Sequence, residues 1–137
     1  MNAIKMPAGK YYIGDLCYVM HKEWGEACEL FFAGRDDYGC NEGKFKLADG
    51  REFVNFNTKY GDGEYFDGLF SYCVDSGSIG CIRVEDIREE LPSAAVVMAF
   101  LEDFECYRDD NMLVFGYVEI DTDPCEEEED EEEEEEY

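Results

Sequence analysis

Three segments rich in glycine and aspartate are the parts of the chain whose residue types could do chemistry. They are Gly14-Asp15-Leu16-Cys17-Tyr18, Tyr60-Gly61-Asp62-Gly63 and Val74-Asp75-Ser76-Gly77-Ser78-Ile79-Gly80. Carboxylate oxygens are the ligands that Ca²⁺ and Mg²⁺ prefer, and glycine lets a backbone close around a ligand. If the segments meet at one end of the fold, we expect Asp15, Asp62 and Asp75 to surround one cation. Tyr18 and Tyr60 would then line the same pocket as interaction residues.

Turn formation is the simpler explanation of the same residues. Aspartate and glycine are ordinary turn residues, because an aspartate side chain accepts hydrogen bonds from the N–H groups of its own loop. The chain also lacks the Asp-x-Asp-x-Asp-Gly loop of an EF-hand, so a cation site would depend entirely on the tertiary arrangement. We therefore predict no resident cofactor, with Ca²⁺ or Mg²⁺ bound by the aspartates as the alternative.

A cysteine nucleophile is the other chemistry that the sequence offers. Cys17 lies shortly before His21, the only histidine of the chain, and Asp15 could orient the imidazole. A catalytic triad is defined by its geometry, however, and one pair within a single segment supports it weakly. The chain has no Gly-x-Ser-x-Gly, Walker, Gly-x-Gly-x-x-Gly or His-Glu-x-x-His motif. We assign no catalytic residue, and whether the protein is an enzyme stays open.

The charge of the chain constrains its partners more than any motif does. The formal net charge is -25 over 137 residues. Eleven of the negative charges lie in residues 126–136, so residues 1–125 still carry a net charge of -14. Such a balance repels nucleic-acid phosphates and anionic membrane surfaces, and it attracts basic proteins. We expect a basic protein partner, no direct binding of nucleic acid and no membrane association.

The last twelve residues are a separate acidic segment. Residues 126–136 are eleven consecutive carboxylates, and Tyr137 follows them. Self-repulsion extends such a run and denies it buried apolar area, so we predict a disordered tail at 126–137 after a single β-rich domain at 1–125. Glu135, Glu136 and Tyr137 are its predicted interaction residues. This end resembles the glutamate-rich, tyrosine-ended tail of α-tubulin, which implies recognition by cytoskeletal domains.

Cysteine usage and hydropathy indicate the compartment. The chain has seven cysteines without close pairs, which is typical of a reducing compartment rather than of a disulfide framework. The absence of any Cys-x-x-Cys and the single histidine argue against a structural zinc site. Its first residues resemble no signal peptide, and no run of about 18 apolar residues occurs. We expect a soluble protein of the cytoplasm or nucleus, in the host cell if it is viral.

The first half of the chain predicts one helix and one hairpin. Residues 10–14 form a short expected strand. Residues 21–33 have apolar side chains at helical spacing and Gly34 after them, which predicts a helix. Alternation on both sides of Asp49-Gly50 predicts a hairpin, since this dipeptide supplies the positive φ angles of a tight turn.

The second half predicts more strands and the overall fold. Residues 69–75 and 79–84 read as an antiparallel pair, and 94–101 as a strand rather than a helix because of Val96-Val97. A last hairpin joins 104–107 to 112–120, with Val114, Val118 and Ile120 on one face. The fold class is therefore mainly β (α+β), a small antiparallel β-barrel or sandwich with one N-terminal helix that covers one face or end.

The order of these segments also resembles a known family. The runs Lys10-Tyr-Tyr-Ile-Gly-Asp-Leu-Cys-Tyr, Tyr60-Gly-Asp-Gly and Tyr72-Cys-Val-Asp-Ser-Gly-Ser-Ile-Gly, with Trp24 between the first two, carry the likeness. They are similar to a family of small uncharacterised proteins from phages, bacteria and large DNA viruses, over residues 9–122. That family tends to have proline at the position of Leu16. The resemblance implies one mixed β domain in a viral or microbial setting, and it transfers no catalytic residue.

Taken together, these patterns favour a non-enzymatic intracellular binding protein. Its body would supply specificity, and its tail would attract a positively charged protein surface. Two alternatives stay open. One is an enzyme or divalent-cation-binding protein that uses the Gly-Asp segments, and the other is a mimic of nucleic-acid phosphates.

Overall fold

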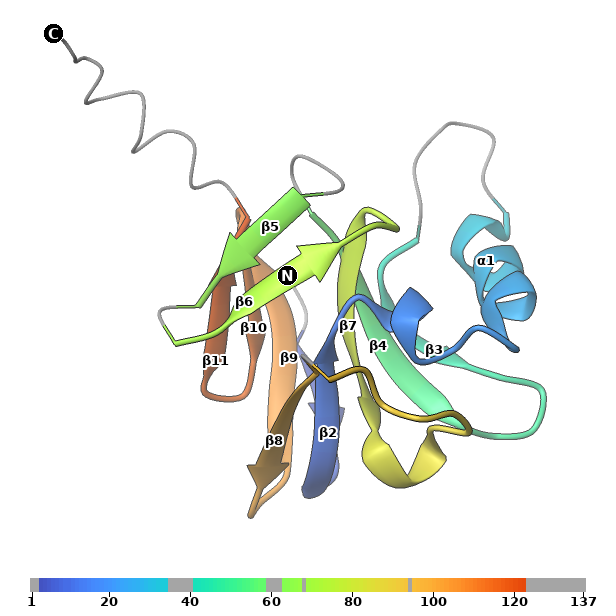
Figure 1. Cartoon of the computed structure of the whole chain (residues 1–137), viewed down its shortest axis with the longest axis horizontal. Coiled ribbons are helices and arrows are strands. Elements are labelled where there is room, and N and C mark those ends of the chain that lie inside the picture. The colour runs from blue at the N-terminus through green and yellow to red at the C-terminus, as the bar shows by residue number, and fades with distance from the viewer. Residues whose placement is uncertain (1–2, 35–40, 59–62, 68, 94, 123–137) are drawn as a thin grey trace, which may run out of the picture.

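The structure is a computed structural model that describes residues 3–34, 41–58, 63–67, 69–93 and 95–122. Its strands form two antiparallel sheets, and one α-helix lies beside them (Figure 1). The six-stranded sheet contains, in spatial order, β1 (Ile4–Met6), β9 (Phe104–Asp109), β10 (Met112–Phe115), β11 (Val118–Asp121), β5 (Gly63–Phe66) and β6 (Ser71–Val74). The five-stranded sheet contains β3 (Gly43–Lys46), β4 (Glu52–Asn57), β7 (Ser78–Arg83), β2 (Gly9–Gly14) and β8 (Val96–Phe100).

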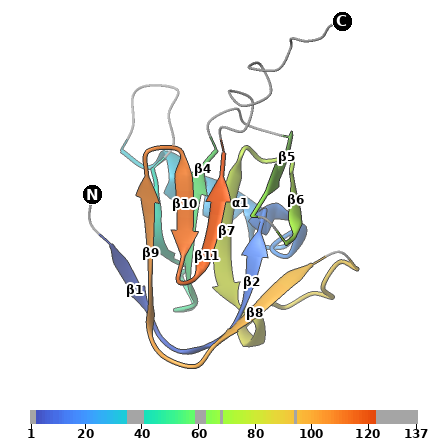
Figure 2. The same cartoon turned by 90° about the vertical axis from the view of Figure 1, so that its left-hand side faces the viewer.

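The two sheets face each other as a sandwich and do not close into a barrel. Figure 2 shows the six-stranded sheet in front of the other one. Of the two architectures that the sequence left open, the barrel is therefore wrong. Among the described residues, the edge strands β1 and β6 of one sheet pair with neither edge strand of the other sheet, β3 and β8. The sequence could not separate the two architectures, because an alternating strand buries one face in either of them.

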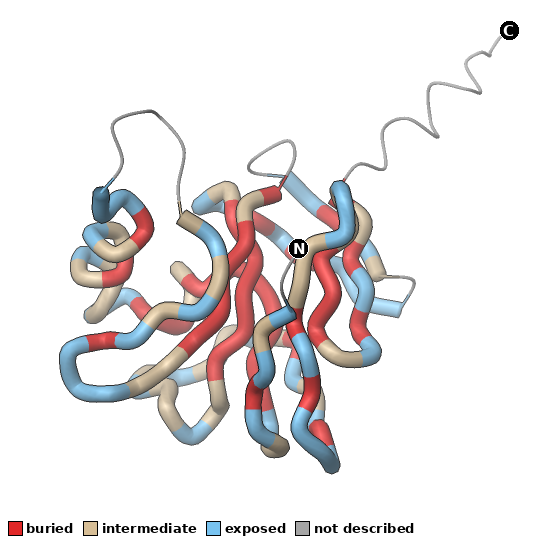
Figure 3. Tube along the Cα trace, turned by 180° about the vertical axis from the view of Figure 1, so that it is seen from behind, coloured by how far each residue is buried: buried red, intermediate tan, exposed pale blue. Residues whose placement is uncertain are grey.

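Alternation along β2 divides the interior into two apolar clusters. Tyr11 and Ile13 point into the space between the sheets, whereas Tyr12 points to the outer face of the five-stranded sheet. The inter-sheet cluster takes side chains from both sheets, and Figure 3 shows buried residues running along these strands. The mainly β character that the sequence predicts is confirmed.

The helix α1 (Trp24–Phe32) covers the outer face of the five-stranded sheet. Ala27 and Phe31 are its buried residues, and the Phe31 ring packs edge-on against Phe45 with centroids 5.0 Å apart. α1 lies inside the predicted range 21–33 and is shorter than it. The described residues also include two 3₁₀ helices, η1 (Leu16–Tyr18) and η2 (Val84–Asp86). No helix within the described ranges is long and apolar enough to cross a membrane.

Two of the predicted strand arrangements agree with the structure. β3 and β4 form the predicted hairpin, with Lys46 opposite Glu52 and Gly50 at a φ of 101° in the turn. Residues 96–100 are a strand, β8, which pairs with β2. The local signals were sufficient here, because a tight turn and a β-branched run act within a few residues.

One predicted pairing is wrong, and one predicted strand is divided in two. The segment 69–75 does not pair with 79–84, because β6 pairs with β5 in one sheet while β7 pairs with β4 and β2 in the other. The predicted last hairpin is present, because β9 pairs with β10. Residues 112–120 are nevertheless two strands rather than one, since Gly116 takes a φ of 65° and starts a turn between β10 and β11. This turn shifts the alternation, so Leu113 and Phe115 join the inter-sheet cluster with Val118 and Ile120, whereas Val114 does not.

Candidate functional site

The carboxylate of Asp15 holds together two of the three Gly-Asp segments. Its side chain is 0% exposed. Oδ2 accepts the backbone N–H groups of Asp75 at 2.6 Å and Ser76 at 2.7 Å, and Oδ1 accepts the Ser76 hydroxyl at 2.7 Å and the Cys17 N–H at 3.0 Å. Asp15 is also the N-cap of η1. A buried carboxylate with four donors is a structural link that fixes one loop against the other.

A close approach between η1 and β7 brings these two loops together. Gly80 lies on β7, where an added Cβ would come within 2.1 Å of the Val54 carbonyl oxygen and 2.9 Å of a Leu16 methyl carbon. Only a residue without a side chain leaves room for Leu16 at this point of the strand. Leu16 is 0% exposed and follows Asp15 directly, so the contact sets the position of the carboxylate.

Tyr18 and Asp75 form a second link at the surface. The Tyr18 hydroxyl donates a hydrogen bond to Oδ2 of Asp75. This hydrogen bond, followed by partial burial, raises the pKa of Tyr18 above its ordinary value. Asp75 itself is exposed, so its carboxylate stands in contact with solvent beside the ring of Tyr18.

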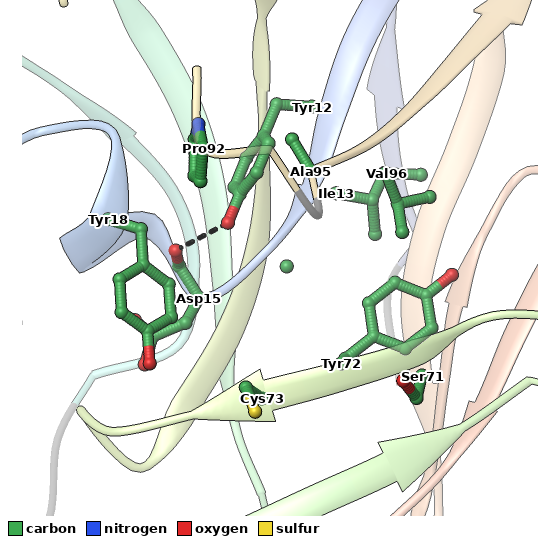
Figure 4. Close-up of a pocket in the computed structure, with 11 residues that line it drawn as sticks. Tyr12, Ile13, Asp15, Tyr18, Ser71, Tyr72, Cys73, Pro92, Ala95 and Val96 are labelled. Atoms are coloured by element: carbon green, nitrogen blue, oxygen red, sulfur yellow. Dashed lines mark hydrogen bonds between the residues drawn. The ribbon is translucent and has the colours of Figure 1, made fainter. Parts of the chain in front are cut away.

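A cavity of about 210 Å³ opens next to this pair, between β6 and the end of β2 (Figure 4). Figure 4 shows its labelled side chains gathered from three parts of the chain. They are Tyr12, Ile13, Asp15 and Tyr18 from β2 and η1, Ser71, Tyr72 and Cys73 from β6, and Pro92, Ala95 and Val96 from β8 and the segment before it. Most of this lining is apolar or aromatic. Asp15 and Tyr18 lie at one end of the cavity, and Ser71 and Tyr72 lie at the other end.

The tyrosine hydroxyls around the cavity are anchored by hydrogen bonds. The Tyr12 hydroxyl donates to the backbone oxygen of Asp15 at 2.9 Å, and the Tyr72 hydroxyl donates to Oδ2 of Asp67 at 2.5 Å. Burial, together with the neighbouring carboxylates, raises the pKa of both tyrosines. The aromatic walls are therefore rigid, neutral surfaces.

Asp67 holds the turn between β5 and β6 in place. Because β6 lines the cavity, Asp67 also fixes the wall that this strand forms. Its Oδ1 accepts the N–H groups of Leu69 at 2.8 Å and Phe70 at 2.7 Å. Burial by itself would raise the pKa of Asp67, but the hydrogen bonds from Tyr72, Phe70 and Leu69 outweigh it and hold the pKa below its ordinary value.

The pair of Cys17 and His21 does not have the geometry of a nucleophile and its base. Nδ1 of His21 lies 2.7 Å from Oε1 of Glu89. Burial, followed by a hydrogen bond to Asp15, raises the pKa of Cys17 to about 12. Within the described ranges no hydrogen bond joins Cys17 to His21. The thiol is protonated at neutral pH, which is the opposite of what nucleophilic catalysis requires.

The residues predicted from sequence are placed only in part. Asp15, Tyr18 and Asp75 come together at one end of the sandwich, whereas Asp62, Tyr60, Glu135, Glu136 and Tyr137 lie outside the described residues. In the part of the chain that is described, no group of three or more histidine, cysteine, aspartate or glutamate side chains is arranged to hold a metal ion. The shared Ca²⁺ or Mg²⁺ site stays a prediction.

The sequence did not single out most of the cavity wall. Tyr72 and Cys73 were expected only as part of a strand, and Pro92 and Ala95 carry no motif. Their place in the site depends on β6 and β8 being edge strands of different sheets, a long-range arrangement that leaves no local signal. Tyr12 could have been found, because it stands between two core residues of a predicted strand and must face the other way.

Comparison with known proteins adds no assignment to this geometry. The chain matches no family model, no curated protein and no solved structure. The function is therefore argued from the charge and shape of the molecule alone.

Proposed function

We propose that this protein binds basic protein surfaces, with its β-rich body providing the specific contact and its acidic end strengthening the attraction. The observation that supports the proposal most strongly is that both parts of the chain are negative. Residues 1–125 carry a formal net charge of -14 and residues 126–136 a further -11. Two regions of the same sign can act on one cationic partner together, and this cooperation raises the association rate and the affinity.

The body's own cations are partly neutralised within the fold. The arginine Arg51, for example, lies 2.7 Å from Glu23 and 2.7 Å from Asp49. Further ion pairs join Lys44 to Glu52, Arg83 to Glu85 and Arg108 to Glu42. Pairing of this kind withdraws basic groups from outside contacts, and the acidic excess of the body is left to face a partner.

A negatively charged surface selects among macromolecules by sign. It repels the phosphates of nucleic acids and anionic lipids, and it offers carboxylates to the lysine and arginine side chains of a partner. Proteins that themselves bind nucleic acid present such side chains, so they are the partner class that we propose, in the cytoplasm or nucleus of a cell. Screening limits the attraction to about 8 Å at physiological ionic strength, so binding must weaken as salt rises.

Calorimetric titration of a defined basic probe tests the proposal. The probe is a synthetic twelve-residue peptide in which lysine and serine alternate. It is titrated into the full chain and into a chain that ends at Cys125. Both proteins should bind it, the full chain more tightly, and both affinities should fall steeply between about 50 and 200 mM salt. A glutamate-for-lysine version of the peptide is the control and should not bind. Failure of both proteins to bind the lysine peptide at the lower salt concentration would refute the proposal.

A further inference from the structure

The cavity beside Tyr18 has the size of a single side chain. Pockets for drug-sized ligands and cofactors measure about 300–1,000 Å³, whereas this one measures about 210 Å³. A cavity of about 150 Å³ is known to hold a benzene ring. The space is therefore too small for a nucleotide or a comparable cofactor, and large enough for one long side chain of another protein.

The walls of the cavity divide into an apolar part and an acidic rim. Ile13 and Val96 are 1% and 6% exposed and form part of the apolar wall, and the ring of Tyr72 faces them. Tyr18 lies at the rim, and its hydroxyl donates a hydrogen bond to the exposed carboxylate of Asp75, which adjoins the cavity without lining it. The apolar wall and the rim together complement a lysine or arginine side chain. Its methylene stem packs on apolar groups, and its charged head reaches an aromatic face and a carboxylate.

The cavity also lies between two strand edges. Within the described residues, β6 is the last strand of one sheet and β8 the last strand of the other. Ser71, Tyr72 and Cys73 of β6 line the cavity, as does Val96 of β8. An extended segment that adds to the β6 edge would place alternate side chains toward the cavity, which is the geometry of β-augmentation.

We infer that this cavity receives one lysine or arginine side chain from an extended, positively charged segment of a partner protein. The inference rests on the proposed function, since it names the part of the body that provides the specific contact. The apolar wall holds the stem, Tyr18 and Asp75 hold the cationic head, and the β6 edge pairs with the segment's backbone.

Charge excludes the other occupants of such a groove. A second copy of this chain would bring another body of net charge -14 against the first, and the chain's own acidic end would bring carboxylates toward Asp75. A neutral apolar peptide would fill the stem part of the cavity but would leave the rim carboxylate without a counter-charge. Only a cationic segment satisfies both parts of the site.

The test uses a pair of nine-residue peptides of alternating threonine and valine. One has a central lysine and the other has norleucine there, which keeps the stem and removes the charge. Affinities are measured with the full chain by fluorescence anisotropy, and the amides that respond are identified by NMR. The lysine peptide should bind about tenfold more tightly than the norleucine peptide, with the largest shifts at Cys73 and Ala95.

Variants of the cavity separate this site from general attraction. Asp75→Asn removes the rim charge, and Ala95→Phe fills the cavity. Cys73→Phe fills it from the exposed side, so it serves if Ala95→Phe does not fold. Each should weaken binding of the lysine peptide about tenfold. Asp103→Asn, in the turn between β8 and β9, changes the net charge by the same amount and should leave binding unchanged.

Every outcome decides the inference. If Ala95→Phe and Cys73→Phe bind the lysine peptide as tightly as the parent chain does, the cavity assignment is overturned. The proposed function then still stands if the twelve-residue basic peptide binds. Equal binding of the norleucine peptide would overturn the cationic occupant. Concentration-dependent dimerisation through β6, seen by analytical ultracentrifugation and abolished by Cys73→Phe, would assign the groove to a second copy. If the full chain binds neither the twelve-residue lysine-serine peptide nor the nine-residue lysine peptide, the proposed function itself is refuted.

Discussion

Replacing Asp15 by asparagine tests how the site is held together. The side chain keeps its size, but one of its two acceptor oxygens becomes an NH₂ donor. Whichever way the amide turns, this donor faces a backbone N–H that the carboxylate now binds, either that of Cys17 or those of Asp75 and Ser76. The substitution therefore removes at least one hydrogen bond, and it removes the charge that strengthens the others.

The expected loss of stability follows from these contacts. A hydrogen bond to a charged group contributes about 1.5–3 kcal/mol, and one between neutral groups about 0.5–1.5 kcal/mol. Losing one bond to Asp15 and weakening the other three would by itself amount to about 5 kcal/mol. Because Asp75 and Ser76 are exposed and can bind water instead, we expect Asp15→Asn to lower the free energy of unfolding by about 3 kcal/mol. A domain stable by about 5–15 kcal/mol still folds after such a loss.

Urea unfolding provides the measurement. The single tryptophan, Trp24, lies on α1 and reports unfolding by fluorescence, with circular dichroism of the sheets as a second probe. Asp103→Asn is the matched control, because Asp103 is exposed and its Oδ1 accepts one hydrogen bond, from the Ala8 N–H at 3.0 Å. We expect the control to lose less than about 1 kcal/mol. Equal losses in the two variants would refute the reasoning that Asp15 is the buried link of the site.

Three further predictions concern residues near the site. Because the pKa of Asp67 is depressed in the folded state, its carboxylate stabilises the fold above the unfolded-state pKa of about 4, and this contribution disappears as the pH falls through the folded-state value. Urea midpoints measured from about pH 7 to pH 2 should therefore fall less for Asp67→Asn than for the parent chain, and identical pH profiles would contradict the assignment. With a pKa of about 12, Cys17 is about 10⁻⁴ thiolate at pH 8, so iodoacetamide followed by mass spectrometry should label it more slowly than the exposed Cys73, and the reverse order would be a contradiction. Gly80→Ala should lower the free energy of unfolding by about 2 kcal/mol, because the new methyl group meets the Val54 carbonyl oxygen, and an unchanged melting temperature would show that the strands can separate there.

Parts of the fold that depend on neighbouring residues could be predicted from the sequence. The Asp49-Gly50 turn and the β-branched start of β8 act locally, and both predictions agree with the structure. The placement of β6 and β7 in different sheets could not be predicted. β6 alternates between exposed and buried residues and β7 is buried almost throughout, but neither pattern names the strand that lies beside it. The turn at Gly116 was missed since the apolar residues on both sides of it form an unbroken run.

In the candidate site, too, some features follow from neighbouring residues and others depend on long-range contacts. The proximity of Asp15 and Asp75 could be expected from the sequence, because both Gly-Asp segments lie at the ends of predicted strands. Their roles differ, and this required the structure: Asp15 is buried and accepts four hydrogen bonds from groups as far as 61 positions along the chain, while Asp75 is exposed. The burial of a carboxylate is a tertiary property, so the residues next to each aspartate in the sequence do not determine it.

The salt dependence of binding to a folded basic protein tests the central claim most directly. The full chain is titrated with a purified basic DNA-binding protein at several salt concentrations, and in parallel with duplex DNA alone. We expect binding to the protein at physiological ionic strength that weakens steadily as salt is added, and no binding to the duplex. Tight association with naked DNA under those conditions, or affinity for the protein that does not change with salt, would contradict it.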